Sequence, residues 1–130
     1  MHTITITTQA KQELVNISSQ VQSLVSQQGW LTGAVLVYCP HTSAAVTINE
    51  GVDPALPLDL LAALDKTAPA TAEYKHVGDN ADAHIKASLI GPDVMVMVIK
   101  GQIQLGHWQS IFFCEFDGPR EREVWIKWMG

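Results

Sequence analysis

The chain has 130 residues, of which 47% are hydrophobic and 16% charged, and this size and composition predict one compact domain over residues 1–130. Glycine and proline number 9 and 6 without a biased tract, which excludes collagen-like and largely disordered proteins. The formal net charge is -5, and the 8 basic residues are scattered along the chain, so nucleic-acid binding is not expected.

Neither a membrane span nor a secretory signal is expected. The longest apolar runs, such as residues 94–99, are far shorter than the ~20 residues that a membrane-spanning helix needs. The start of the chain lacks a basic segment followed by an apolar one, which predicts a cytoplasmic protein with no membrane partner. Cys39 and Cys114 each lie in an apolar, strand-like run, which favours buried reduced thiols over a disulfide.

The beginning of the chain predicts strands followed by a short helix. Residues 2–8 alternate apolar and polar positions and are rich in β-branched side chains, which is typical of a half-buried strand. Residues 13–17 could pair back on this strand. Ser18 or Ser19 then offers an N-cap, and Gly29 stands where a left-handed C-cap would end an amphipathic helix.

The middle of the chain predicts two strands and two helices. The continuous apolar character of residues 33–39 predicts a strand covered on both faces, and residues 44–48 are expected to continue it or pair with it. Asp53-Pro54 begins a helix that runs through Asp65. Between residues 80 and 91 a second helix is expected to turn its apolar side chains inward, namely Ile85 and Leu89.

The last third of the chain alternates apolar segments with glycine-containing turns. It predicts four strands, at residues 94–100, 102–105, 109–116 and 123–128. Together these patterns predict the α+β class: a single β-sandwich-like domain of antiparallel-rich sheets with two or three short helices.

Polar residues capable of chemistry gather at joints between these apolar elements. The first joint follows the strand at residues 33–39 and contains His41, Thr42, Ser43, Asn49 and Glu50. A polar cluster directly after a buried strand is typical of a binding site held at the edge of a rigid scaffold. The alternative is that Thr42, Ser43 and Asn49 only satisfy backbone groups of turns.

The second joint carries His76 and His84. If a helix begins near Asp82, His84 lies in its first turn, where the positive end of the helix dipole favours the neutral imidazole that a metal needs. Three imidazoles with a free fourth position are the arrangement of a catalytic zinc site, and His41 is the third candidate. Taken singly, each histidine could equally be an inert surface residue.

A third polar cluster lies near the end of the chain. Arg120 follows a Gly-Pro turn and could form a planar fork for a phosphate or carboxylate group. The alternative is a surface ion pair with Glu121 or Glu123. Phosphate-binding loops, dinucleotide-binding glycine motifs and the nucleophile elbow of α/β-hydrolases are all missing from the sequence.

With these residues in view, the sequence resembles the YjbQ family of small proteins, also called the secondary thiamine-phosphate synthase family. The stretches that carry the resemblance are residues 41–50, Asp53-Pro54 with Asp59, 80–91, 106–109 and 115–120. The sequence departs from the family pattern at three positions. His107 stands where a small Thr is usual, Met97 where a Pro is common, and Pro57 where an Arg often follows the Asp-Pro pair.

The resemblance implies a β-sandwich-like α+β subunit that assembles as a homotrimer with polar sites near subunit boundaries. It also implies a weak thiamine-phosphate synthase activity, which joins a pyrimidine diphosphate to a thiazole phosphate and releases pyrophosphate. By matching position, it implies the site residues His41, Thr42, Ser43, Asn49, Glu50, Asp82, His84 and Lys86, followed by His76, Gln109 and Arg120.

The leading hypothesis is therefore a metal-assisted enzyme that handles a phosphorylated small molecule. The expected ligands of a divalent ion, zinc, are His41, His76 and His84. The expected catalytic residues are Glu50 or Asp82 as the base, with Lys86. The side chains expected to bind the anionic substrate are Thr42, Ser43, Asn49, Ser88, Gln109 and Arg120. The alternatives are a metal-dependent hydrolase and a non-catalytic trimer that binds a metal or another ligand.

Overall fold

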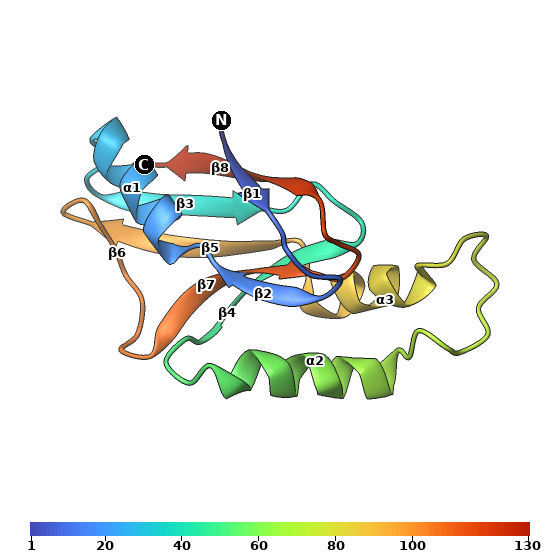
Figure 1. Ribbon diagram of the computed structural model, residues 1–130. Coiled ribbons are helices and arrows are strands. Elements are labelled where there is room, and N and C mark those ends of the chain that lie inside the picture. Colours follow the sequence, from blue (N-terminus) through green and yellow to red (C-terminus); the bar gives the residue numbers. More distant parts are fainter.

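The structure, a computed structural model that describes all of residues 1–130, contains two antiparallel sheets and three helices (Figure 1). In the five-stranded sheet the strand order is β1 (His2–Thr7), β8 (Glu121–Met129), β3 (Gly33–Tyr38), β5 (Asp93–Ile99) and β6 (Gln102–Ile103). The three-stranded sheet has the order β2 (Glu13–Asn16), β7 (Gln109–Glu115) and β4 (Ala44–Glu50). The α+β sandwich predicted from the sequence is confirmed.

The main core fills the space between the two sheets. Alternate residues of β3 and β5 point into it, so Val35, Val37, Val96 and Val98 are buried while their neighbours face outward. Burying each of these side chains contributes about 1.5–3 kcal/mol. Helix α1 (Ser18–Gln28) closes the core at one end and stops at Gly29, which has the predicted left-handed conformation with φ 66°.

A second core lies on the other face of the three-stranded sheet. Helices α2 (Ala55–Thr67) and α3 (Ala81–Ile90) cover that face (Figure 1). They bury a cluster made of Ala45, Leu61, Leu64, Ala83, Ala87, Cys114 and Phe116. Strand β7 is therefore covered on both sides, and α3 is held against β4. Both cysteines are buried and unpaired, as the sequence predicted.

Two strand pairings differ from the prediction. The segment at residues 13–16 pairs with β7 rather than with β1, and β4 also pairs with β7 rather than with β3. The alternation of side chains shows which face of a strand is buried but not which strand lies beside it.

The start of α1 also differs from the prediction. Ser18 is not the N-cap, because Ile17 occupies the capping position and the Oγ of Ser18 accepts the Ile111 N–H at 2.9 Å.

The buried face of α3 also differs from the prediction. Ile85 and Leu89 are 39% and 55% exposed, whereas Ala83, Lys86 and Ala87 face the protein. The small alanines let α3 approach the sheet closely. Close packing therefore determines which face of α3 is buried, and the larger apolar side chains Ile85 and Leu89 lie on the outer face. The outer face of β3 is likewise uncovered in this chain, with Tyr38 exposed. None of the three helices combines the length and the apolar character needed to span a bilayer.

Candidate functional site

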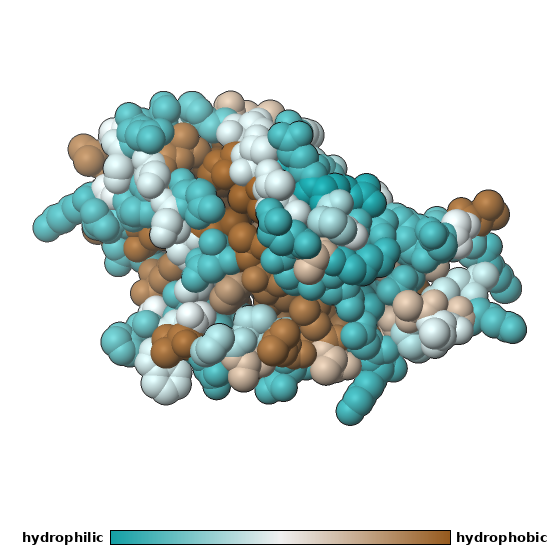
Figure 2. Space-filling model, viewed as in Figure 1, coloured by the Kyte–Doolittle hydropathy of each residue, from teal (hydrophilic) through white to brown (hydrophobic).

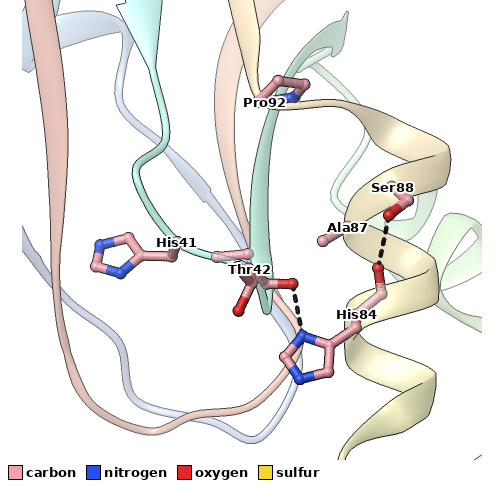
Figure 3. Close-up of a pocket in the computed structure, with 7 residues that line it drawn as sticks. His41, Thr42, His84, Ala87, Ser88 and Pro92 are labelled. Carbon is pink, nitrogen blue, oxygen red and sulfur yellow. Dashed lines mark hydrogen bonds between the residues drawn. The ribbon is translucent and has the colours of Figure 1, made fainter. Parts of the chain in front are cut away.

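A cavity of about 490 Å³ opens between α3 and the loop that joins β3 to β4 (Figure 3). Its walls carry several hydrogen-bonding side chains beside small apolar ones, namely His41, Thr42, Ala44, His84, Ala87, Ser88 and Pro92. Four of these are residues that the sequence predicted for the site. The loop that follows the core strand β3 and the packed helix α3 fix their backbone positions.

His41 occupies the loop at the end of β3. Its Nε2 accepts a hydrogen bond from the backbone N–H of Glu123 in β8 at 2.9 Å. Burial lowers the pKa of His41 from its ordinary value of 6.5, and the nearby positive charge of Arg122 lowers it further. The imidazole is therefore neutral at pH 7. In Figure 3 its ring points away from α3.

His84 lies in the first turn of α3, where the sequence placed it. Its Nδ1 donates a hydrogen bond to the carbonyl oxygen of Thr42 at 2.9 Å, which ties the helix to the β3–β4 loop (Figure 3). The ring of His76 meets that of His84 edge to face, with centroids 5.0 Å apart. Ser88 Oγ donates to the His84 carbonyl at 3.0 Å, so its hydroxyl keeps only acceptor capacity.

A buried ion pair contacts the β3–β4 loop through Ser43, which does not line the cavity. Arg122 and Glu115 are 3% and 0% exposed, and Arg122 Nε donates to Glu115 Oε1 at 2.9 Å. Arg122 Nη2 also donates to Glu115 and, at 2.9 Å, to the hydroxyl of Ser43. Thr8 Oγ1 donates to Glu115 Oε1 at 2.8 Å. The predicted site residue Ser43 therefore faces this network rather than the cavity.

Sequence reasoning missed Glu115 and Arg122 as residues that support the site. A signal was present, because Glu115 ends the apolar run of β7 and Arg122 lies two residues before Val124 and Ile126, on the core-facing side of β8. Such positions almost always hold a paired charge. The sequence did not show that the two side chains pair with each other.

A second charged cluster joins α3 to α2. Lys86 is 0% exposed, and its Nζ donates to Asp65 Oδ1 at 2.7 Å, to Gln12 Oε1 at 2.9 Å and to Asp82 Oδ2 at 3.1 Å. Neither Lys86 nor Asp82 lines the cavity beside His41. Asp82 borders a smaller cavity, of about 240 Å³, under the loop at residues 70–79.

The remaining predicted residues lie elsewhere. Asn49 and Glu50 end β4, about 20 Å along the strand from the His41 loop. Glu50 Oε1 accepts the backbone N–H groups of Val52 and Asp53 at 2.6 and 2.7 Å, and so it caps the turn before α2. Gln109 faces Glu50 across the sheet, and its Oε1 accepts the N–H of Gly106 at 2.6 Å.

Arg120 also has local partners. Its guanidinium donates to the side chain of Asp117 at 2.9 Å and to the carbonyl oxygen of the same residue at 2.9 Å. The Asp117 carboxylate further accepts from Lys11 and from Asn80. Arg120 therefore helps to fix the β7–β8 turn and is not among the residues that line the cavity.

The three histidines predicted as zinc ligands are not brought to one point within the chain. His76 and His84 are neighbours, but the Nε2 lone pair of His41 is used by the backbone of β8. No set of three or more histidine, cysteine or acidic side chains is arranged to hold a metal ion. Because a catalytic zinc site needs three protein ligands, the residues of a single chain do not fit that group.

The chain matches the family model described as UPF0047 protein YjbQ-like over residues 2–130. It is 42% identical to the UPF0047 protein YugU of Bacillus subtilis, an alignment that covers 100% of this chain and 99% of the relative. A UPF0047 protein of Methanocaldococcus jannaschii is 41% identical over 96% of this chain and 91% of its own length.

Solved structures agree with these sequence matches. An uncharacterised YjbQ/UPF0047 protein of Clostridium acetobutylicum superimposes with a TM-score of 0.96 at 41% identity, covering 99% of this chain and 100% of that one. A hypothetical protein of Aeropyrum pernix gives a TM-score of 0.95 at 34% identity, covering 99% and 97%.

Proposed function

The chain belongs to the YjbQ-like UPF0047 protein family, and we propose that it is an enzyme that binds a phosphorylated small molecule in the cavity between His41 and His84. The observation that supports this proposal is the set of hydrogen-bonding side chains around one small cavity. Its volume of about 490 Å³ lies in the range of small-molecule sites. The three side chains we assign to ligand binding are His41, Thr42 and His84.

The cavity would hold phosphate by neutral hydrogen bonds rather than by a free cation. Lys86 and Arg120, which the sequence suggested as anion receptors, are paired with Asp82 and Asp117. Backbone contacts fix both imidazoles, and His84 already donates its Nδ1–H to the Thr42 carbonyl. The donors left for phosphate are the Nδ1–H of His41 and the hydroxyl of Thr42, which is an exposed residue. Prepositioned N–H and O–H donors stabilise a phosphate without the cost of reorganising water.

The reaction we propose is the synthase reaction implied by the family resemblance. A carbon–oxygen bond between the pyrimidine's methylene group and pyrophosphate breaks, and a carbon–nitrogen bond to the thiazole forms. Pyrophosphate leaves with the electron pair of the broken bond. Hydrogen bonds from the cavity side chains would stabilise the negative charge that develops on this leaving group.

We further propose that the protein assembles with copies of itself, as the family resemblance to a homotrimer implies. The outward face of the five-stranded sheet supports this proposal. It exposes a row of large apolar side chains on β3, β5 and β8, namely Tyr38, Met95, Met97, Ile99 and Met129. Contiguous exposed apolar patches of this kind mark interaction surfaces.

Release of pyrophosphate tests the proposed function. The purified protein is incubated with the pyrimidine diphosphate and the thiazole phosphate, and the His84→Ala and Thr42→Val variants are compared with the wild type. We expect each variant to lose about 10-fold or more in kcat/KM. The matched control is His107→Ala, which changes an exposed histidine outside the cavity.

The other outcomes of this assay separate the alternatives. Unchanged kcat/KM in His84→Ala would contradict the assignment of the cavity. Phosphate binding without turnover would indicate a non-catalytic binding protein, and release of inorganic phosphate from one substrate alone would indicate a hydrolase.

Elemental analysis of tag-free protein measures whether zinc accompanies the chain, and His76→Ala tests whether any zinc depends on the predicted ligands.

A further inference from the structure

A second cavity, of about 310 Å³, adjoins the cavity beside α3. The residues that line it include Tyr38, His41, Pro92 and Trp125. It shares His41, Thr42 and Pro92 with the first cavity. In Figure 3 the imidazole of His41 points away from α3, and its Nε2 is bound to the backbone of β8, the strand that carries Trp125. The two cavities therefore have a common wall at the β3–β4 loop.

Tyr38 and Trp125 form an aromatic pair in the second cavity. They lie directly opposite each other on β3 and β8, which are neighbours in the five-stranded sheet (Figure 1). Both side chains project from the outward face, because the adjacent residues Val37, Val124 and Ile126 point into the main core. The ring centroids are 5.9 Å apart and the ring planes are inclined by 23°, so the rings stack on each other. The tyrosine is exposed and the tryptophan is half-buried.

Hydrogen bonds of the backbone hold the walls of this cavity in position. The Glu123 N–H donates to His41 Nε2 at 2.9 Å, which fixes the imidazole. The Cys39 N–H donates to the carbonyl oxygen of Pro92 at 2.7 Å, which ties the end of β3 to the residue before β5. Binding to a preformed wall costs less conformational entropy than binding to a mobile one.

The size and the lining of the second cavity favour a single planar ring. Its volume lies at the lower end of the range of about 300–1,000 Å³ that is typical of ligand sites. Aromatic side chains bind aromatic rings by offset stacking or edge-to-face contacts, and these contacts add to the free energy of burying apolar surface. An aliphatic group of the same size gains only the burial.

We propose that the second cavity binds an aromatic ring of the ligand whose phosphate group is held at the common wall by His41 and Thr42. Trp125 and Tyr38 contact this ring and determine a preference for aromatic phosphate esters. This inference rests on the proposed function and adds a ring-binding part to its site. Tyr38 also belongs to the apolar row proposed for self-association, so the ring lies at the edge of that face.

Three phosphate esters of equal charge test the ring-binding cavity. Calorimetry measures the binding of benzyl phosphate, of cyclohexylmethyl phosphate, whose ring is neither planar nor aromatic, and of ethyl phosphate, which has no ring. We expect the wild type to bind benzyl phosphate about 5- to 100-fold more tightly than ethyl phosphate, the effect of one stacking contact. Its preference for benzyl over cyclohexylmethyl phosphate should be about 2- to 10-fold.

Variants of the aromatic pair locate this preference. Trp125→Leu keeps an apolar side chain but removes the ring, so it should lose the preference for benzyl over cyclohexylmethyl phosphate. Trp108→Leu is the matched control, because Trp108 is an exposed tryptophan that lines neither cavity, and it should retain the preference. Tyr38→Leu changes an exposed position and should reduce the same preference, so it serves as the test if Trp125→Leu does not fold.

NMR of the indole N–H groups provides a readout that identifies the binding position. Benzyl phosphate should shift the indole signal of Trp125, because the ring current of the bound phenyl group acts on it. Ethyl phosphate should shift this signal less, and neither ester should shift the signal of Trp108.

The outcomes separate the ring-binding cavity from the proposed function. Equal binding of all three esters by the wild type would overturn the ring-binding cavity and leave phosphate binding intact. Equal binding of the benzyl and cyclohexylmethyl esters would overturn the aromatic class of the ligand. A preference that persists in Trp125→Leu, with a smaller mass by light scattering, would show that another copy of the chain covers the pair and would overturn the assignment. Failure of every ester to bind would overturn the proposed function and the ring-binding cavity with it.

Discussion

Glu115 and Arg122 show how single residues support the cavity without touching it. Their ion pair is buried between β7, β8 and the β3–β4 loop, and Thr8 and Ser43 satisfy the remaining hydrogen-bonding groups. A buried pair of this kind adds little net stability, but loss of one partner leaves an unpaired charge that costs about 3–5 kcal/mol. Its value to the protein lies in the fixed position of the loop that carries His41 and Thr42.

Acid should destabilise the protein through its paired carboxylates. Burial alone would raise the pKa of Glu115, but hydrogen bonds from Arg122, the Asp117 backbone and Thr8 hold it below its ordinary value of 4.5. The Lys86 hydrogen bond lowers the pKa of Asp65 below 3.8. A carboxyl with a lowered folded pKa binds fewer protons in the folded state, so its stabilisation is complete above the unfolded pKa and disappears as the pH falls through the folded value.

The lowered pKa of His41 means that the unfolded chain takes up a proton below about pH 6.5 before the folded protein does. We therefore expect the urea midpoint of unfolding to decline slightly between about pH 6.5 and pH 5 and to fall more steeply below about pH 4. The Arg122→Met variant removes the cation that faces Glu115, so it should already be destabilised at pH 7, by about 3 kcal/mol or more. A midpoint that stays constant down to pH 3 in the wild type would contradict this account.

At the scale of elements, α3 is the helix that connects the site to the rest of the fold. One of its faces contributes alanines to the second core, and His84 reaches the β3–β4 loop from its first turn. Lys86 attaches the same helix to Asp65 of α2 and to Gln12 before β2. Displacement of α3 would therefore change both the second core and the cavity.

Variants of the Lys86 cluster should differ according to how exposed each partner is. Lys86→Met removes a fully buried cation and leaves Asp82 without its partner, so we expect a loss of about 3 kcal/mol in the free energy of unfolding. Asp65→Asn removes a carboxylate that is half exposed, and a loss of about 1 kcal/mol or less is expected. Chemical denaturation measures both. Equal losses would show that the cluster is not organised around the buried lysine.

At the scale of the whole molecule, the two faces of the sandwich differ in how they are covered. Helices α2 and α3 cover the three-stranded sheet, whereas no helix packs on the outward face of the five-stranded sheet. In the view of Figure 2, apolar surface gathers over the middle of the molecule and along α2, and most of the remaining surface is hydrophilic. The outward face of the five-stranded sheet also exposes apolar side chains, among them Met95, Met97 and Ile99 of β5.

A charge placed in that row should weaken self-association. Met97 is 63% exposed and lies on β5, so Met97→Lys should leave the fold intact and shift the protein towards smaller species. Light scattering coupled to size exclusion measures the mass, and circular dichroism checks the fold. The matched control, Gln102→Lys, adds the same charge at an exposed position of β6. An equal mass for wild type and Met97→Lys would contradict an interface at this face.

The sequence alone determined the fold class, the extent of α2 and α3, the end of α1 at Gly29 and the place of His84 in the first turn of its helix. These features depend on local periodicity and capping, which neighbouring residues specify. For the site, it identified the four polar residues that the structure brings to one cavity, His41, Thr42, His84 and Ser88.

Only the tertiary structure decided which strands pair, which face of α3 is buried and which charges meet. Glu50 and His41 lie at opposite ends of one strand although both occur in the same polar segment of the sequence. Glu115 and Arg122 pair across two neighbouring segments, and Lys86 gathers partners from Gln12 and Asp65. These contacts depend on how distant parts of the chain pack together, and local patterns of hydrophobicity do not encode that packing.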